Sequence, residues 1–421
     1  MSPEARERFL GMMLLILVSI IYFFANLQKV VVPGSVFNEL QTLFGCDAAS
    51  VTGLGAGFMY AYSINQLTVG ALADRYSGTR VIAVGGALFC IGSLLSAYSG
   101  SLGLLFVSRV LTGFGASAVY LSMLKMIFRI TPEAYTFVLG IIMLVGYSGS
   151  VVSGAPFVKL VAEYGYSKCM LTTGIVTTLC YILFVINAAC SRLPEVNKEV
   201  TLSWETYKSV LAKKHNRHCY LTTSVGFAIF YSMQMTIGKK FLEDFSGTSS
   251  DTAGIVMSAA MVISSCNAFV QAVLSKLLGN RRLIFMRFCG FGCLAGTLLL
   301  LGSVFFNCKH WLLPSAAWLL LSFAGNNATV QVAMLRETNP ENRVGTSLSI
   351  GNCFSYLLIA IVGTLTGKLL ELFPPDNVNG IKIYGRNSYM AVFALLTLLG
   401  ISCAVNSLFL KETRGKKIEV D

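Results

Sequence analysis

Three basic side chains fall inside long apolar stretches of the chain: Lys29, Arg109 and Lys125. A charged group at bilayer depth is costly, so such a residue predicts a functional site by default. A polar cavity that holds positive charge favours an anionic ligand, which would offset the cost of removing the cations from water. The chemistry that these residues predict is the binding of an anion.

The carboxylates follow a different pattern. The chain has 20 aspartates and glutamates, and none of them lies near the centre of an apolar stretch. A proton relay across a membrane uses buried Asp or Glu, and a pocket for amphiphilic cations is expected to contain a buried acid. The sequence therefore argues against both.

Helical spacing indicates which side chains share a face of the first apolar stretch. Tyr22, Asn26, Lys29 and Pro33 are spaced i, i+4, i+7 and i+11, which places them on one stripe of a helix. The stripe predicts that Asn26 and Lys29 face the same cavity. Because Lys29 lies toward one end of its stretch, the alternative is that its ammonium reaches the membrane surface.

The fourth apolar stretch carries the other two cations. Around a helix, Arg109 and Tyr120 lie within about 40° of each other, whereas Lys125 lies about 160° from Arg109. Unless the helix bends, only one of the two cations faces a given cavity. The alternatives are that Arg109 bonds carbonyls or polar groups of helix 1 and that Lys125 extends to the interface.

Further polar and aromatic side chains are candidates for substrate contacts. Their alternative role is an interhelical hydrogen bond, which buried amides in membrane helices commonly make. These candidates are Tyr62, Gln66, Tyr231, Gln234, Asn327 and Asn352.

The elements that position these residues are membrane-spanning helices. Of 421 residues, 55% are hydrophobic and 12% charged, where a soluble domain has about a quarter charged residues. A bilayer core of about 30 Å needs about 20 apolar residues per helix. The sequence therefore predicts twelve spans, roughly at residues 10–32, 52–72, 81–99, 102–127, 136–162, 169–190, 218–241, 252–275, 284–306, 311–335, 344–371 and 388–410.

Basic residues predict the orientation. The net charge is +12, and Lys and Arg gather in alternate connections, which the positive-inside rule assigns to the cytoplasm. Both termini are then cytoplasmic, and the chain is a multi-pass protein of the cytoplasmic (inner) membrane. The charge does not indicate nucleic-acid binding, because no basic stretch is interleaved with a soluble fold.

The longest connection, residues 191–217, divides the spans into two sets of six. We expect an N-terminal six-helix bundle over 1–190, a cytoplasmic linker over 191–217, and a C-terminal six-helix bundle with its tail over 218–421. Within the linker, apolar residues such as Trp204 alternate with charged ones at helical spacing. An interfacial amphipathic helix and a flexible linker are both compatible with this pattern.

A short charged turn separates the second and third spans. It contains Gly70, Asp74, Arg75, Gly78 and Arg80, and a variant of it recurs at 272–282. A loop that recurs once in each half indicates two related halves. Asp74 can pair with Arg75 or Arg80, which predicts a cytoplasmic gating loop that breaks and re-forms its contacts as the halves move.

These residues resemble the major facilitator superfamily over nearly the whole chain. Segment 70–80 is similar to the signature between its second and third helices, 109–116 to its helix 4 motif R-x-x-x-G-x-G-A, and 411–415 to its common tail. The resemblance implies an all-α membrane protein with 12 transmembrane helices in two pseudo-symmetric six-helix bundles. It also implies a cavity lined by helices 1, 4, 7 and 10.

One branch of that superfamily, the carriers of organic anions and organophosphates, is the most similar. Tyr62 and Gln66 ahead of the signature, and Lys125 at the end of helix 4, carry this likeness. The two arginines that the branch uses for phosphate esters are replaced, one by Ala25 and the other near Tyr231. The resemblance thus implies an organic anion and disfavours phosphate esters.

These observations predict a secondary active transporter of a small organic anion, a carboxylate or a related compound, that works by alternating access as a symporter or an antiporter. The alternative is a proton-coupled exporter of drugs or other amphiphilic compounds. A membrane sensor that signals through 191–217 is a third possibility, from another class. An enzyme is not expected, because the sequence lacks nucleophile-elbow, zinc-protease and phosphate-loop motifs.

We expect no cofactor and no metal site. Most of the 12 cysteines lie inside apolar stretches, where they act as small apolar side chains, and the sequence has no C-x-x-C pair. The expected partners are the anionic substrate and membrane lipid, and the protein is expected to be a monomer.

Overall fold

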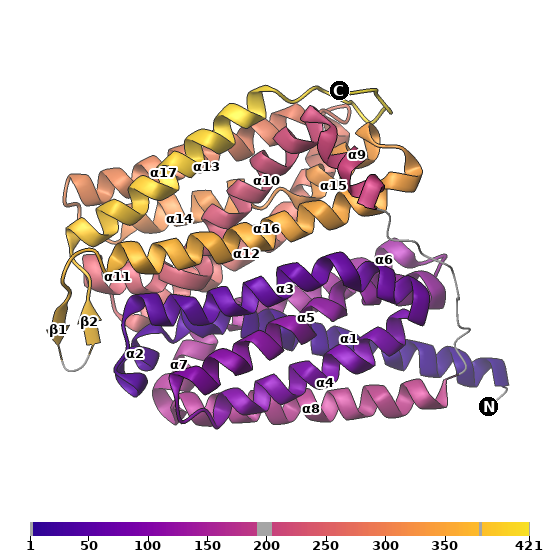
Figure 1. Cartoon of the computed structure of the whole chain (residues 1–421), viewed down its shortest axis with the longest axis horizontal. Coiled ribbons are helices and arrows are strands. Elements are labelled where there is room, and N and C mark those ends of the chain that lie inside the picture. Colours follow the sequence, from indigo (N-terminus) through magenta and orange to yellow (C-terminus); the bar gives the residue numbers. More distant parts are fainter. Residues whose placement is uncertain (1–2, 192–203, 379–380, 421) are drawn as a thin grey trace. The chain divides into compact units, whose positions relative to one another are not determined.

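The chain is almost entirely helical. The computed structural model describes residues 3–191, 204–378 and 381–420, except for the side chains of 3–4, 70–71, 73–75, 136 and 342. By its contacts the chain divides into two units, which are treated separately below. Unit 1 is Met1–Val31 with Gly57–Leu202, and unit 2 is Val32–Ala56 with Ser203–Asp421 (Figure 1).

Unit 1 is a bundle of long apolar helices. The helix α1 packs along α6, and α4 packs along both α5 and α8. Its core contains Leu14, Val18, Met123 and Ile127. The helices are α1 (Pro3–Val30), α3 (Ala48–Tyr76, from Gly57 on), α4 (Gly78–Ala97), α5 (Leu102–Ile130), α6 (Tyr135–Val152), α7 (Ala155–Tyr164) and α8 (Tyr166–Cys190).

Unit 2 combines long helices with short ones and one hairpin. Here α13 packs along α14 and α17, and α10 packs along α16 and α17. The elements are η1 (Val31–Ser35, from Val32 on), α2 (Phe37–Phe44), the start of α3, α9 (Trp204–Ala212), α10 (Lys214–Ser232), η2 (Met233–Ile237), α11 (Gly238–Ser246), α12 (Ser250–Leu277), α13 (Leu283–Phe305), α14 (Leu312–Gly325), α15 (Ala328–Thr338), α16 (Glu341–Leu370), β1 (Asp376–Val378), β2 (Ile381–Ile383) and α17 (Arg386–Leu408).

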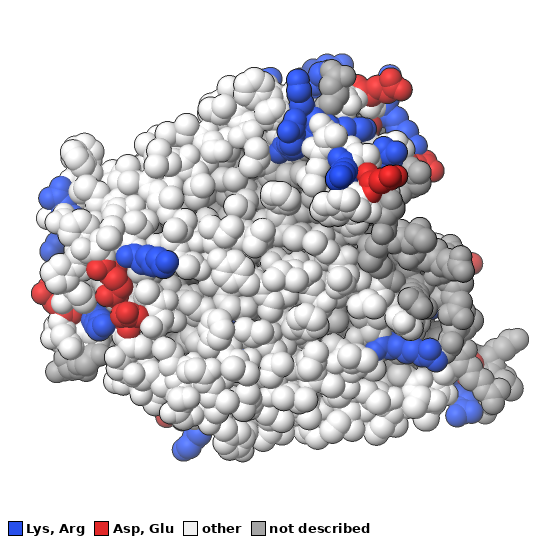
Figure 2. Space-filling model, in the orientation of Figure 1, with Lys and Arg blue, Asp and Glu red and all other residues white. Residues whose placement is uncertain are grey.

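The predicted all-α membrane fold is confirmed. Among the described residues, eight helices are by themselves long and apolar enough to cross a membrane, and the bent pair α6–α7 makes a ninth. The other predicted spans correspond to α3, to α10 with η2, and to the pair α14–α15. In unit 2, Figure 2 shows charged side chains gathered over α9 and the C-terminal tail and again near the hairpin, with an uncharged surface over α16 and α17 between them.

The first span is interrupted where the sequence predicted a continuous stripe. The helix α1 ends at Val30, and Val32 has φ −109° and ψ 113°, which is extended backbone. The ring of a proline disfavours helical geometry at the residue before it, so Val32 leaves the helix ahead of Pro33. Pro33 therefore does not continue the stripe of Asn26 and Lys29, and this part of the prediction is wrong.

Three more predicted spans are broken helices. The fifth bends by 48° between α6 and α7, where Pro156 stands at the beginning of α7 and cannot donate a backbone hydrogen bond. The seventh is divided into α10, η2 and α11, and the tenth breaks at Asn326 and Asn327 between α14 and α15. The continuous helices predicted over 136–162, 218–241 and 311–335 need this correction.

A buried ion pair holds the end of unit 2 that carries the hairpin. Lys240 Nζ lies 2.8 Å from Asp244 Oδ1, and the two side chains are 0% and 3% exposed. Asp244 also accepts hydrogen bonds from the backbone N–H of Tyr384 (3.0 Å) and the hydroxyl of Tyr389 (2.9 Å). One pair thus fixes α11 against the chain that leaves the hairpin and enters α17.

The connection between the first two spans is attached to this same end. Glu243, paired with Lys239 at 2.8 Å, accepts a hydrogen bond from Asn38 of α2 at 2.8 Å. Glu371 accepts one from the backbone N–H of Ala48 at 2.7 Å and another from Tyr384. Burial, followed by that bond to Glu371, raises the pKa of the Tyr384 hydroxyl, so it remains a donor at neutral pH. These bonds account for the grouping of 32–56 with unit 2, although the sequence predicted an N-terminal bundle over 1–190.

The predicted linker contains a short helix. Over Trp204–Ala212 the chain forms α9, whose Val210 is buried in a core cluster with Tyr220 and Met334. Trp204 is exposed and stacks with Tyr207 at 6.4 Å between ring centroids. Residues 192–203 of the linker lie outside the described residues.

Removing one charge of the buried pair tests its role. We expect Asp244→Asn to lower the free energy of unfolding by about 3–5 kcal/mol, because it leaves Lys240 buried without its carboxylate. The double variant Lys240→Met with Asp244→Leu should recover much of that loss, since an apolar pair replaces the ion pair. Thermal unfolding of the purified protein measures both, and a single variant as stable as the native chain contradicts the assignment.

Candidate functional site

The two predicted residues of helix 1 form a buried polar pair in unit 1. Lys29 donates from Nζ to Asn26 Oδ1 at 2.9 Å, and Asn26 Nδ2 donates to the carbonyl oxygen of Tyr22 at 2.9 Å. The two side chains are 5% and 2% exposed. The stripe of α1 therefore places an ammonium and an amide together inside the unit.

Helix α6 closes over this stripe through small residues. A Cβ built on Gly149 would lie 2.1 Å from the carbonyl oxygen of Phe23, so only glycine permits this contact between the backbones of α1 and α6. One residue later, Ser150 donates to the carbonyl oxygen of Asn26 at 3.2 Å. The close approach brings the side chains of α6 beside Asn26.

Three tyrosine rings gather at the other end of the stripe, around Tyr22. Tyr22 stacks with Tyr120 of α5 at 6.0 Å between centroids and an interplanar angle of 24°, and it meets Tyr147 of α6 at 6.3 Å. From Tyr22 to Lys29 the stripe spans about 10 Å along α1. An ammonium and an amide at one end with aromatic rings at the other match the usual composition of a small-molecule site, mostly apolar with a few polar groups. Such a site can bind a carboxylate by charge-assisted hydrogen bonds.

Arg109 comes from α5 and contacts α1 at a different place from the Lys29–Asn26 pair. It donates from Nη1 to the carbonyl oxygen of Gln28 at 3.0 Å, and its Cζ lies 4.6 Å from the centre of the Phe58 ring. Gln28 and Lys29 are neighbours that point about 100° apart on the helix. Arg109, which is 1% exposed, therefore makes the bond to a helix 1 carbonyl that the sequence left open as its alternative role.

Of the remaining candidates in unit 1, one lies near Arg109, and the others lie away from both Arg109 and the Lys29–Asn26 pair. Tyr62 stacks on Phe58 at 6.0 Å between centroids, so it extends the ring that Arg109 covers. Gln66 Nε2 donates to the carbonyl oxygen of Ser117 at 3.4 Å. Lys125 is half-buried on α5. The structure thus groups Asn26, Lys29 and Tyr120 through Tyr22, and places Tyr62 with Arg109.

In unit 2 the candidates are spread over several helices. Tyr231 is buried against Phe227, with 4.4 Å between ring centroids. Gln234, in η2, donates to the carbonyl oxygen of Met257 at 3.1 Å. Asn352 is half-buried on α16.

Asn327 and its neighbours hold the break between α14 and α15. Asn327 Nδ2 donates to the carbonyl oxygen of Phe285 at 3.3 Å, which is an interhelical bond of the kind that the sequence left open. Asn267 of α12 donates to the carbonyl oxygens of Phe323 (2.7 Å) and Asn326 (2.8 Å). Because the break leaves these carbonyls without helical donors, the amides of neighbouring side chains satisfy them.

The predicted gating loop is described in part. Gly70, Asp74 and Arg75 fall in the last turns of α3, and their side chains lie outside the described residues. A Cβ on Gly78 would lie 2.5 Å from the carbonyl oxygen of Ser122, so glycine allows α4 to begin against α5. Ser77, at φ +74°, caps α4 by accepting the N–H of Arg80 at 3.5 Å, and Arg80 itself is exposed.

The second copy of this loop, in unit 2, has partners that sequence reasoning missed. Arg282 Nη2 lies 2.8 Å from Glu337 Oε1 at the end of α15. Glu412 accepts the N–H groups of Arg282 (2.7 Å) and Leu283 (3.1 Å), which places a carboxylate at the N-terminus of α13, where the helix dipole stabilises it. The resemblance of 411–415 to the common tail of the superfamily could have drawn attention to Glu412, whereas no sequence pattern singled out Glu337.

Comparison with known proteins agrees with this architecture. A family model described as Major Facilitator Superfamily matches residues 14–364. Two solved structures have similar folds: the nucleoside transporter NupG, with a TM-score of 0.70 and 15% identity over 96% of this chain and 100% of that one, and a bacterial homologue of the human lysosomal transporter Spinster, inward-facing and unoccupied, with 0.69 and 14% over 97% and 96%. At these identities the likeness shows the fold.

Curated relatives match shorter stretches. The 4-hydroxybenzoate transporter PcaK of Pseudomonas aeruginosa is 28% identical over 163 residues, which are 38% of this chain and 35% of that protein. The probable anion transporter 3, chloroplastic, of Oryza sativa subsp. japonica is 30% identical over 110 residues, 26% and 21% of the two chains. The matches thus span about a third or less of the length of these relatives.

The contacts of Arg109 predict a structural effect that needs no ligand. We expect Arg109→Gln to lower the free energy of unfolding by about 1.5–3 kcal/mol, the range for a hydrogen bond to a charged group, because the Gln28 carbonyl loses its donor. Arg129→Gln, half-buried at the end of the same helix, is the matched control. Thermal unfolding without added ligand measures both. If Arg109→Gln is as stable as the native chain, the structural role is wrong and Arg109 remains a candidate for substrate binding.

Proposed function

Because the chain belongs to the Major Facilitator Superfamily, we propose that it is a secondary active transporter that moves a small organic anion across the cytoplasmic membrane by alternating access. Family and fold are those of transporters, and the chain is a multi-pass membrane protein. The anionic substrate, the mode of coupling and the orientation are the proposed parts.

The observation that carries the proposal is the buried pair of Lys29 and Asn26. The ammonium of Lys29 lies 2.9 Å from the amide oxygen of Asn26, so a cationic and a neutral polar donor stand together inside the unit. A substrate carboxylate bound there would add the opposite charge in a low-dielectric site, where charge-assisted hydrogen bonds are strong. The tyrosines at the other end of the stripe favour an anion that carries a ring, because aromatic faces bind apolar and aromatic groups.

The relatives support the same substrate class. One is named for a hydroxylated aromatic carboxylate and another for anions. Both properties, a negative charge and a ring, correspond to the two ends of the site in unit 1. We therefore propose an aromatic carboxylate as the first substrate to test.

Proton-coupled export of drugs or other amphiphilic compounds is the alternative. Such a pocket needs an acid that can bind a cation or a proton. Two acids of α11, the half-buried Glu243 and the buried Asp244, are each paired with a lysine at 2.8 Å, so they fit this role poorly. For an anion carrier, exchange of anions or entry of the substrate with a proton both satisfy the charge balance.

The gating loop and the topology complete the proposal. We place both termini and the 191–217 linker on the cytoplasmic side, because the basic residues gather there in the sequence. Asp74 with Arg75 and Arg80 would form the gate of the first half on that side. The contact of Arg282 with Glu337 at 2.8 Å is the corresponding charged contact at the recurring loop.

Ligand-dependent stability tests the substrate class. We expect 4-hydroxybenzoate to raise the melting temperature of the purified protein, by the equivalent of about 2.7 kcal/mol at a concentration of 100 times its Kd. Lys29→Gln should remove this shift, because the carboxylate loses its cation, whereas Lys159→Gln, exposed on α7, should leave it unchanged. Uptake or counterflow of the same labelled anion in proteoliposomes then tests transport.

The comparison ligands separate the alternatives. Aliphatic carboxylates that stabilise the protein as well as benzoate does would contradict the role given to the tyrosine rings but keep the anion site. If lipophilic cations raise the melting temperature and no anion does, the anion site is rejected and export becomes the leading function.

A further inference from the structure

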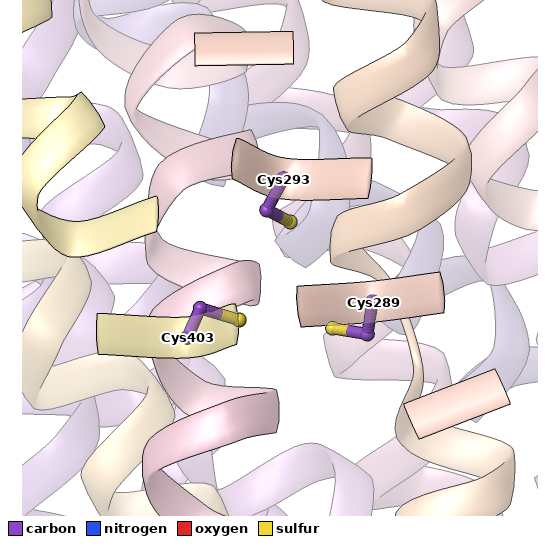
Figure 3. Close-up of side chains that lie close together, drawn as sticks. All are labelled: Cys289, Cys293 and Cys403. Atoms are coloured by element: carbon purple, nitrogen blue, oxygen red, sulfur yellow. The ribbon is translucent and has the colours of Figure 1, made fainter. Parts of the chain in front are cut away.

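Three cysteine thiols converge inside unit 2. Cys289 and Cys293 are one turn apart on α13, and Cys403 comes from α17, which packs along α13. All three are 0% exposed, and their sulfur atoms lie within 4.8 Å of one another. Figure 3 shows the sulfurs of Cys289 and Cys403 turned toward each other, with Cys293 beside them.

A glycine of α10 leaves space over the three sulfurs. A Cβ built on Gly226 would lie 2.8 Å from Sγ of Cys289, 3.3 Å from Sγ of Cys293 and 3.6 Å from Sγ of Cys403. One point thus contacts all three sulfur atoms, and the residue beside it has no side chain. The thiols surround a common centre, as the ligands of a metal ion do.

We propose that Cys289, Cys293 and Cys403 form a site for a soft monovalent metal ion, cuprous copper. Thiolate ligands select soft ions such as Cu(I) over magnesium, calcium or manganese. Three bonds of about 2.3 Å in a plane hold sulfurs about 4.0 Å apart, which small rotations of these side chains reach. Zinc is a poorer match, because its structural sites are almost always four-coordinate.

Binding of the ion is coupled to loss of the thiol protons. Cysteine binds a metal as the thiolate, so Cu⁺ held by all three sulfurs releases three protons, one from each thiol, and leaves a complex with a net charge of −2. Because a net charge is costly in an apolar interior, we expect binding to weaken as the pH falls. The carbonyl oxygen of Thr222 accepts hydrogen bonds from the thiols of Cys403 (3.0 Å) and Cys289 (3.8 Å), which hold these two side chains in place before an ion binds.

The position of the site connects two helices of unit 2. Cys289 lies six residues after the start of α13 and Cys403 five before the end of α17, so each is about 8–9 Å along its helix from that end. A bound ion would join α13 to α17 by covalent bonds. We therefore expect it to stabilise unit 2, independently of any transported anion.

Metal titration tests the site. Purified, reduced protein is titrated with cuprous ion held at known free concentrations by a competing chelator, and X-ray absorption counts the sulfur neighbours. We expect one tight site per chain with three sulfurs and a rise in melting temperature on binding. Cys293→Ser and Cys403→Ser should each weaken binding by at least about tenfold, the loss expected even for changes outside the first ligands.

Controls keep packing defects apart from lost ligands. Cys90→Ser, a buried cysteine of α4 in unit 1, should bind copper as the native chain does. A serine variant that melts early without metal is replaced by its alanine counterpart, which keeps the site apolar. A native chain that binds no cuprous ion, holds it by two sulfurs, or binds it as well after all three cysteines become alanine overturns the proposal.

Discussion

Polar groups removed from water must find their partners inside the same bundle, and this constraint shapes both units. Where a span breaks at Asn326 and Asn327, the carbonyls freed by the break are bonded by the amide of Asn267. Where α11 carries buried charges, Lys240 and Asp244 meet at 2.8 Å. In an apolar environment an unmet polar group costs several kcal/mol. The irregular segments persist because neighbouring side chains supply the missing bonds.

The same constraint gives the predicted site residues different hydrogen-bond acceptors. Arg109 and Asn327 donate hydrogen bonds to backbone carbonyls of other helices, at 3.0 and 3.3 Å. Each bond therefore fixes one helix against another. Lys29 instead donates to a side-chain amide at 2.9 Å, on a stripe that ends in tyrosine rings. A side-chain acceptor such as Asn26 can rotate, whereas a backbone carbonyl is fixed by its helix. For this reason we propose that Lys29, and not Arg109, contacts the substrate.

Much of the fold was predictable because apolar length and charge asymmetry are properties of the sequence itself. The spans, the family resemblance and the polar stripe of α1 followed from them. The breaks in the helices were harder to predict, because the count of apolar residues in a stretch does not show a turn at Asn326 that the amide of a distant residue stabilises. Pro33 and Pro156 were usable signals for two of the interruptions, and Asn379-Gly380, a hairpin-type pair, was one for the strands. No local pattern indicated that Asp244 would meet Tyr384 and Tyr389 of a segment 140 residues away.

The cysteines show the limit of local patterns most clearly. Within α13 the spacing of Cys289 and Cys293 is that of any two residues on one helical face, and small apolar side chains suit the contact with α10 equally well. What distinguishes them is Cys403, which reaches the same point only because α17 packs along α13 and because Gly226 has no side chain. A three-sulfur centre is a property of helix packing, so it becomes visible only after the helices are placed. The same holds for Tyr22, whose neighbours Tyr120 and Tyr147 come from two other helices.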